Sequence, residues 1–147
     1  MVKENKEKTR LDDLLDKTEP YATFHDAMLH TITIDYDTKE FTARVDLCVG
    51  NPDAKTEIER ERRRIGVLKA SGMIFWALEP PDNEDRERWG PLWLTDDGLI
   101  KEAPTKTAKK LISTLVPDTY GWYLYFADIN AFGYLLAKGA VFKWERT

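Results

Sequence analysis

The chain has 147 residues, of which 42% are hydrophobic and 33% are charged, and its net charge at pH 7 is −4. This length is enough to bury a core without disulfides, and we predict a single domain over residues 1–147, with the Lys- and Glu-rich residues 1–10 disordered. The acidic balance argues against nucleic acid or an anionic membrane as the main partner, and the aromatic share of 12% favours β structure.

The first predicted element is a short helix near residues 10–18. Leu11, Leu14 and Leu15 recur there at helical spacing, and Pro20 marks its limit. From His30 onward the hydrophobic period changes to two. Two alternating runs, 30–36 and 41–49, flank the polar turn "DTKE", which predicts a β-hairpin with one face toward water.

The next segment leaves two alternatives open. The charged run Arg60–Arg64 is either a solvated helix, with a Glu59–Arg63 pair, or a charged extension of the following strand. The apolar residues 65–78 are either two strands joined by a turn at Ser71-Gly72 or one bent strand with a glycine bulge.

The remaining sequence predicts a long polar loop interrupted by "LWL", a helix near 106–115, and a three-stranded meander with turns at "DIN" and "KG". Ala108, Leu111, Ile112 and Leu115 share one face of this helix. The expected fold class is therefore mostly β (α+β), an antiparallel sheet or a β-sandwich with one or two short helices.

Both histidines of the chain lie in "FHDAMLHTITIDY", with Asp26 between His25 and His30. If the strand phase of Ile32 and Ile34 runs back unbroken, Asp26 and His30 share a face and lie about 13 Å apart, too far to share a metal or a proton. Two histidines without a zinc-binding spacing are a poor metal set. The sequence favours local hydrogen bonding at a strand entry and leaves the role of this polar cluster unknown.

No other catalytic set is recognisable in the sequence. Cys48 has no partner motif for a nucleophile, the loop carboxylates do not match a calcium loop, and no phosphate-binding glycine motif is present. We therefore expect no metal, no cofactor and no catalytic residue, and we consider an enzyme the less favoured interpretation.

Four aromatic residues are the candidate binding residues. Trp89 and Trp93 lie in the acidic loop, where an exposed aromatic in a charged rim would make an anchor. Tyr123 and Tyr125 alternate with Trp122, Leu124 and Phe126, so this pair is either an exposed binding face or is covered by the predicted helix, which the sequence favours.

Cysteine usage and the absence of targeting patterns indicate a cytoplasmic protein. Cys48 is the only cysteine, the start of the chain has no secretory h-region, and the longest apolar runs are far shorter than the roughly 20 residues of a membrane helix.

The F-H-D-A element at 24–27 and the aromatic strand ending in "KWE" resemble a group of small, mostly uncharacterised bacterial β-rich domains, some of which resemble immunity proteins of toxin systems. The resemblance implies a non-enzymatic role.

The leading prediction is thus a cytoplasmic bacterial binding or protein-interaction domain, with an immunity protein as one form of this role. Its expected partner is another protein, and neither nucleic acid nor a membrane. The alternative is a small hydrolase or ligand-binding protein that uses His25, Asp26 and His30.

Overall fold

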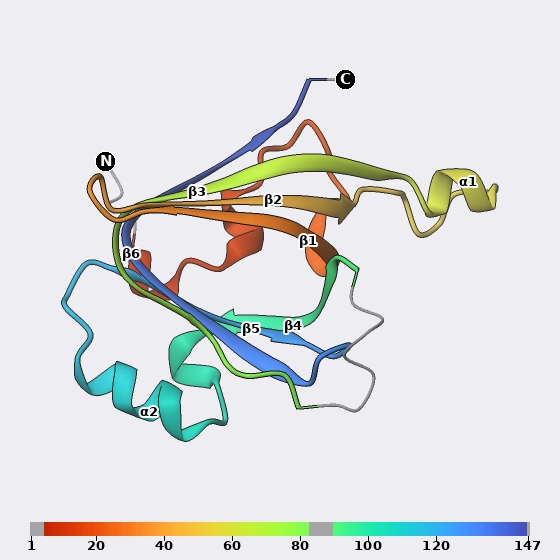
Figure 1. The fold of residues 1–147 in the computed structure, drawn as a ribbon. Helices are drawn as coiled ribbons and strands as arrows, with labels where there is room; N and C mark the ends of the chain where they lie inside the picture. The colour runs from red at the N-terminus through yellow and green to blue at the C-terminus, as the bar shows by residue number, and fades with distance from the viewer. Residues whose placement is uncertain (1–4, 83–89, 147) are drawn as a thin grey trace.

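The computed structural model describes residues 5–82 and 90–146, which form a closed antiparallel β-barrel of six strands in the order β1-β2-β3-β6-β5-β4 (Figure 1). The strands are β1 (Thr23–Asp35), β2 (Glu40–Cys48), β3 (Arg63–Leu78), β4 (Leu92–Leu99), β5 (Tyr120–Phe126) and β6 (Ala131–Trp144). The helices are α1 (Glu57–Arg60) and α2 (Lys106–Ser113), with 3-10 helices η1 (Lys6–Lys8), η2 (Leu11–Leu14) and η4 (Ile100–Glu102). The mostly β, antiparallel prediction is confirmed.

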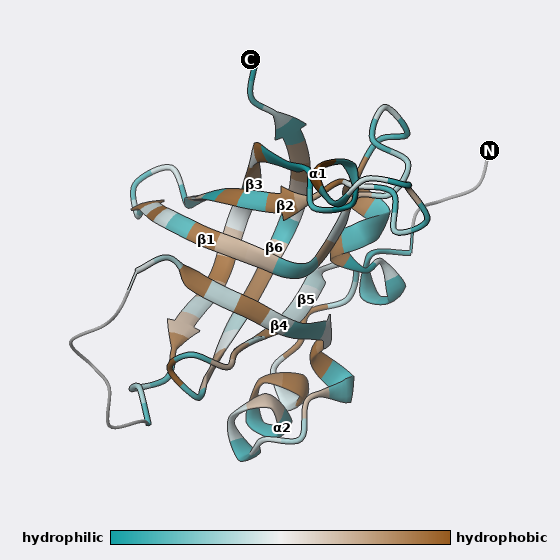
Figure 2. Cartoon of the chain, turned by 90° about the vertical axis from the view of Figure 1, so that its right-hand side faces the viewer, coloured by the Kyte–Doolittle hydropathy of each residue, from teal (hydrophilic) through white to brown (hydrophobic). Residues whose placement is uncertain are grey.

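The sheet closes into a barrel, and the predicted sandwich is wrong on this point. Strand β2 pairs with Arg63–Ala70 of β3, and β6 pairs with Gly66–Leu78, so the second half of β3 runs on past the end of β2. Three residue pairs between β1 and β4, Ala27↔Leu94 to Leu29↔Leu92, complete the circuit. Figure 2 shows these two strands side by side. Closure gives every strand two neighbours and so removes the sheet edges that a sandwich would leave open.

The β1–β2 hairpin is confirmed, but the unbroken phase through β1 is wrong. Phe24, Ala27 and Leu29 are buried on the inner side, whereas His30 is on the outer side. The pairing of β1 with β2 shifts twice, between Thr23 and Met28 and again between Leu29 and Thr31. The first shift leaves three extra residues in β1 and the second leaves one. An odd number of extra residues reverses the side to which the following residues point.

The alternative of one bent strand is the correct one for residues 65–78. Gly72 has a φ of 58°, which a side chain would strain, and it sits where β3 bends. The charged run contains both predicted structures, because α1 ends at Arg60 and β3 begins at Arg63.

Three further predictions are corrected and one is confirmed. No turn forms at "KG": Lys138 and Gly139 lie within the continuous strand β6, and Gly139 pairs with Ser71 opposite. The "LWL" stretch belongs to strand β4, and the helix expected near 10–18 is only the 3-10 turn η2. The helix expected near 106–115 is α2.

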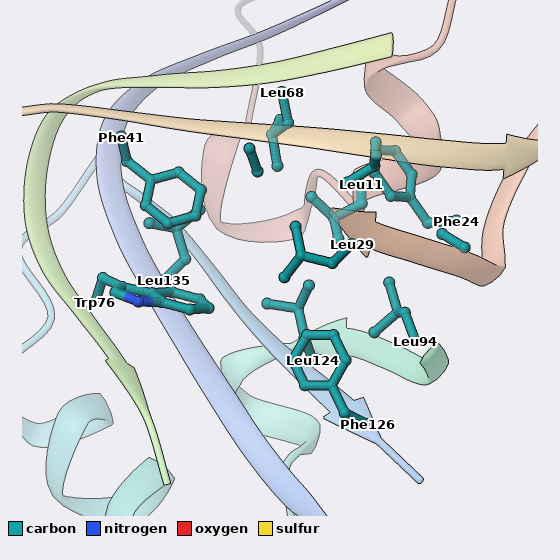
Figure 3. A pocket seen from close by; sticks show the side chains of 13 residues that line it. Leu11, Phe24, Leu29, Phe41, Leu68, Trp76, Leu94, Leu124, Phe126 and Leu135 are labelled. Carbon is teal, nitrogen blue, oxygen red and sulfur yellow. The ribbon is translucent and has the colours of Figure 1, made fainter. Parts of the chain in front are cut away.

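The main core fills the barrel, and the segment before β1 closes one of its ends. Leu11 is 1% exposed, and the indole Nε1 of Trp122 donates a hydrogen bond of 2.8 Å to the carbonyl of Thr9. Apolar side chains leave an interior cavity of about 20 Å³, shown in Figure 3, which has room for little more than one water molecule. A second, smaller core lies between α2 and the outer side of β5 and β6. Across residues 5–82 and 90–146, no helix is long and apolar enough to span a bilayer.

Candidate functional site

Asp26 lies at the first β-bulge of β1, where its backbone adopts a φ of 66°. Non-glycine residues rarely adopt this left-handed conformation, and bulges of this kind re-aim a side chain. The neighbours Phe24 and Ala27 are both 1% exposed inside the barrel, whereas 47% of the Asp26 side chain is exposed. The bulge therefore presents a carboxylate on the outer surface between two core residues.

The side chain of Trp93 binds this carboxylate from the neighbouring strand. Its indole Nε1 donates a hydrogen bond of 2.9 Å to Oδ1 of Asp26. Its backbone N–H lies 3.3 Å from both carboxylate oxygens of Asp128. Trp93 is nonetheless 41% exposed, so a large aromatic ring is held in a defined orientation at the surface. Asp26 of the polar cluster and the candidate anchor Trp93, which the sequence marks separately, thus form one site.

Arg63 of β3 ties the bulge to the middle of the sheet. Its Nη2 donates to the backbone carbonyls of Asp26 and Asp46, at 2.8 and 2.9 Å. Its Nε donates to Oδ1 of Asp46 at 2.9 Å. A guanidinium that binds two neighbouring strands fixes the geometry of the bulge as well as neutralising Asp46.

The two histidines lie beside different aspartates. Nε2 of His25 is 3.6 Å from Oδ2 of Asp26, and Nε2 of His30 is 3.9 Å from Oδ2 of Asp46. The sequence predicts local hydrogen bonds for His25 and Asp26. The backbone N–H of His25 does bond locally, to Oγ1 of Thr23 at 3.1 Å, whereas the Asp26 carboxylate bonds across strands to Trp93. Neither histidine lines the interior cavity.

We name this surface the Trp93 patch. It consists of His25, Asp26, His30, Asp46, Arg63 and Trp93. It contains no serine or cysteine nucleophile, and in the described part of the chain no three His, Cys, Asp or Glu side chains are grouped to hold a metal. An exposed aromatic ring with a rim of paired charges is an arrangement suited to binding a partner.

The other predicted binding residues lie elsewhere. Trp89 is outside the described residues. Tyr123 is 8% exposed and packs in the second core with α2, and its hydroxyl donates to Oδ2 of Asp96 at 3.0 Å. Burial raises the pKa of Tyr123 to about 12, with the Asp96 hydrogen bond adding to the effect. Tyr125 donates to Oδ1 of Asn130 at 2.6 Å. The helix therefore covers Tyr123, which is the alternative that the sequence favours.

Sequence reasoning missed Arg63 and Asp46 as members of the site. Their contact depends on the register of β2 against β3 and on the bulge in β1, and no local pattern signals either. The only available hint is that Arg63 begins one strand and Asp46 points outward from the preceding strand, so that the two could pair.

Comparisons with protein-family models, with curated protein sequences and with solved structures return no match. The resemblance to small bacterial β-rich domains stays a prediction.

Proposed function

We propose that this protein is a non-enzymatic, cytoplasmic protein-interaction domain that docks a partner protein through the Trp93 patch. The observation that carries the proposal is the Trp93 indole, 41% exposed and held by Asp26. Ordering a side chain at an interface costs about 0.5–1.5 kcal/mol, and a ring that is already fixed avoids part of that cost.

The charges around the ring favour a partner with a basic surface. The Asp26 carboxylate is exposed beside the indole, and the Asp128 carboxylate accepts from the backbone N–H of Trp93. The positive charge of Arg63 is already paired with Asp46. The whole chain also carries a net charge of −4. A partner with Lys or Arg around a pocket for the indole would match this surface, and such complementarity acts mainly on the association rate.

The resemblance to immunity-like domains agrees with this role. An immunity protein binds a toxin domain without chemistry, and a toxin-like gene next to this one would favour that form of the proposal over a metabolic role.

The test combines capture from a lysate with a measured affinity. We expect the wild-type protein to retain a basic protein, identified by mass spectrometry and then purified. Trp93→Ala should weaken its binding by about 2 kcal/mol or more, roughly thirtyfold, as expected of a buried anchor. Asp26→Ala should weaken it less, because the ring remains but loses its fixed orientation. The association rate should fall as salt is raised.

Tyr36→Ala is the matched control, since Tyr36 is a more exposed aromatic, at 77%, at the opposite end of β1. It should bind as the wild type does. The proposal fails if Trp93→Ala and Tyr36→Ala bind the partner equally well, or if wild type retains no protein that Trp93→Ala loses.

A further inference from the structure

An open groove of about 670 Å³ lies where the β1–β2 hairpin approaches the bend of β3, at the other end of β1 from Asp26. Figure 1 shows the hairpin beside the bends of β3 and β6. The groove walls are apolar and come from Ile34, Tyr36, Met73, Ile74, Phe75 and Trp76, with Val116 at one side. The volume is within the range of roughly 300–1,000 Å³ typical of small-molecule sites.

Exposed apolar side chains gather in this groove. Tyr36 is 77% exposed, Ile74 44% and Val116 49%. Single exposed apolar residues are ordinary, but several that line one concave surface indicate a binding site.

Two lysines supply the charge of the groove. Lys39 adopts a φ of 59° at the hairpin, and its carbonyl accepts a hydrogen bond of 2.8 Å from the backbone of Met73, which fixes the hairpin against the groove. The stem of Lys138 lies over Gly72, where an added Cβ would come within 3.0 Å of it. The absence of a side chain at Gly72 therefore leaves room for Lys138 at the groove.

No carboxylate lines the groove within the described residues. Oδ1 of Asp35, next to Tyr36 in the chain, accepts hydrogen bonds from the backbone N–H groups of Asp37 and Thr38, at 2.9 and 3.1 Å. Glu40 pairs with Lys69 at 3.5 Å, and Asp118 pairs with Lys6 at 3.7 Å. In a protein of net charge −4, the lining of this groove therefore carries two positive side chains, Lys39 and Lys138, and no negative one, beside apolar surface.

We propose that this groove binds a free single-chain anionic amphiphile, a fatty-acid-like carboxylate. The carboxylate lies at Lys39 and Lys138, and the alkyl chain covers Ile74 and the other apolar walls. This is a ligand site in addition to the protein-binding role of the Trp93 patch, and it does not depend on that role.

Trp76 confines the ligand to the groove. Its side chain lines the interior cavity (Figure 3). The same side chain lines the groove, and so it forms the wall between the two. The ring packs on Phe41, with centroids 4.9 Å apart, and lies against Gly133. The interior cavity, at about 20 Å³, is too small for an alkyl chain.

The experiment is calorimetric titration of the full chain with dodecanoate below its critical micelle concentration, and with dodecyltrimethylammonium as the probe of opposite charge. We expect saturable one-to-one binding of dodecanoate and binding of the cation at least about tenfold weaker. Lys39→Gln combined with Lys138→Gln should weaken dodecanoate binding at least about tenfold. Ile74→Glu, at an exposed position, should abolish it without unfolding the protein.

Lys101→Gln combined with Lys109→Gln is the charge-matched control, since both side chains are exposed and neither lines the groove. This variant should bind dodecanoate as the wild type does. The proposal is overturned if the cation binds as tightly as dodecanoate, if the groove lysine variant binds like the control, or if no binding occurs. Binding to phosphatidylglycerol vesicles in preference to free dodecanoate would also overturn it, since the ligand would then be a membrane surface.

Discussion

Asp97 of β4 carries a carboxyl group whose pKa burial raises from 3.8 to about 6. Repulsion from Asp12 and Asp96 adds to the shift, while Arg10 and His25 partly oppose it. The folded state therefore binds more protons than the unfolded chain between about pH 4 and pH 6. Asp97 contributes its full stability below about pH 4 and loses it as the pH rises through about 6.

We predict that Asp97→Asn stabilises the protein at pH 7.5. A shift of this size corresponds to roughly 3 kcal/mol, and water around the partly exposed side chain screens it, so we expect a gain of about 1 kcal/mol in the free energy of unfolding. Most of the gain should disappear at about pH 4, where the carboxyl group is neutral in the folded state and about half protonated in the unfolded chain. Urea unfolding at both pH values measures it.

Asp53→Asn is the control, because Asp53 is an exposed loop carboxylate. It should leave the unfolding free energy unchanged at both pH values. A gain for Asp97→Asn that is equal at pH 4 and pH 7.5 would contradict burial as the cause.

Helix α2 depends on a single side chain at its start. The Thr105 hydroxyl accepts a hydrogen bond of 3.2 Å from the backbone N–H of Ala108, as an N-cap does. The same hydroxyl bonds to the phenol of Tyr134, whose side chain is buried in the second core. One threonine therefore caps the helix and joins it to β6.

We predict that Thr105→Ala destabilises the protein by about 2 kcal/mol, because it removes the cap and leaves the buried Tyr134 hydroxyl without that partner. Thr105→Ser keeps the oxygen and should cost less than about 0.5 kcal/mol. Urea unfolding midpoints measure both. Equal losses in the two variants would show that the methyl group of Thr105, and not its hydroxyl, stabilises α2.

The barrel as a whole is closed at one end by a segment that precedes it in the chain. Leu11 of η2 is 1% exposed and lines the interior cavity together with side chains of several strands. Leu14 packs at the margin of the same core and is only partly buried. The two leucines therefore differ in burial within one turn of 3-10 helix.

We predict that Leu11→Ala lowers the free energy of unfolding by about 3 kcal/mol, since it enlarges an interior cavity that rigid strands cannot collapse. Leu14→Ala should cost about 1 kcal/mol. Urea unfolding measures the difference, with one common value for the dependence of the unfolding free energy on urea concentration. A smaller loss for Leu11→Ala than for Leu14→Ala would mean that the segment does not close the barrel.

The β1–β2 hairpin and α2 could be predicted from the sequence because their hydrophobic periods are local and continuous. The sequence left the course of β3 open, because Ser71-Gly72 is typical of both a turn and a glycine bulge. The length of β6 could not be predicted, since Gly139 reads as a turn residue and instead lies within the strand, paired with Ser71. Strand β4 could not be predicted because Thr95, Asp96 and Asp97 interrupt its alternation of apolar and polar residues. In β1 the two bulges reverse the side of the sheet to which the sequence pattern assigns the residues between them.

The sequence by itself determined the antiparallel β character and most of the apolar faces, because each depends on residue type and near neighbours. It also marked Asp26 as part of a polar cluster of unknown role and Trp93 as a candidate binding residue. Only the tertiary structure decided that these two residues meet. They are 67 positions apart, and the contact needs both the bulge in β1 and the short β1–β4 pairing that closes the barrel. Strand register and closure are set by the packing of the whole core, which no local pattern encodes.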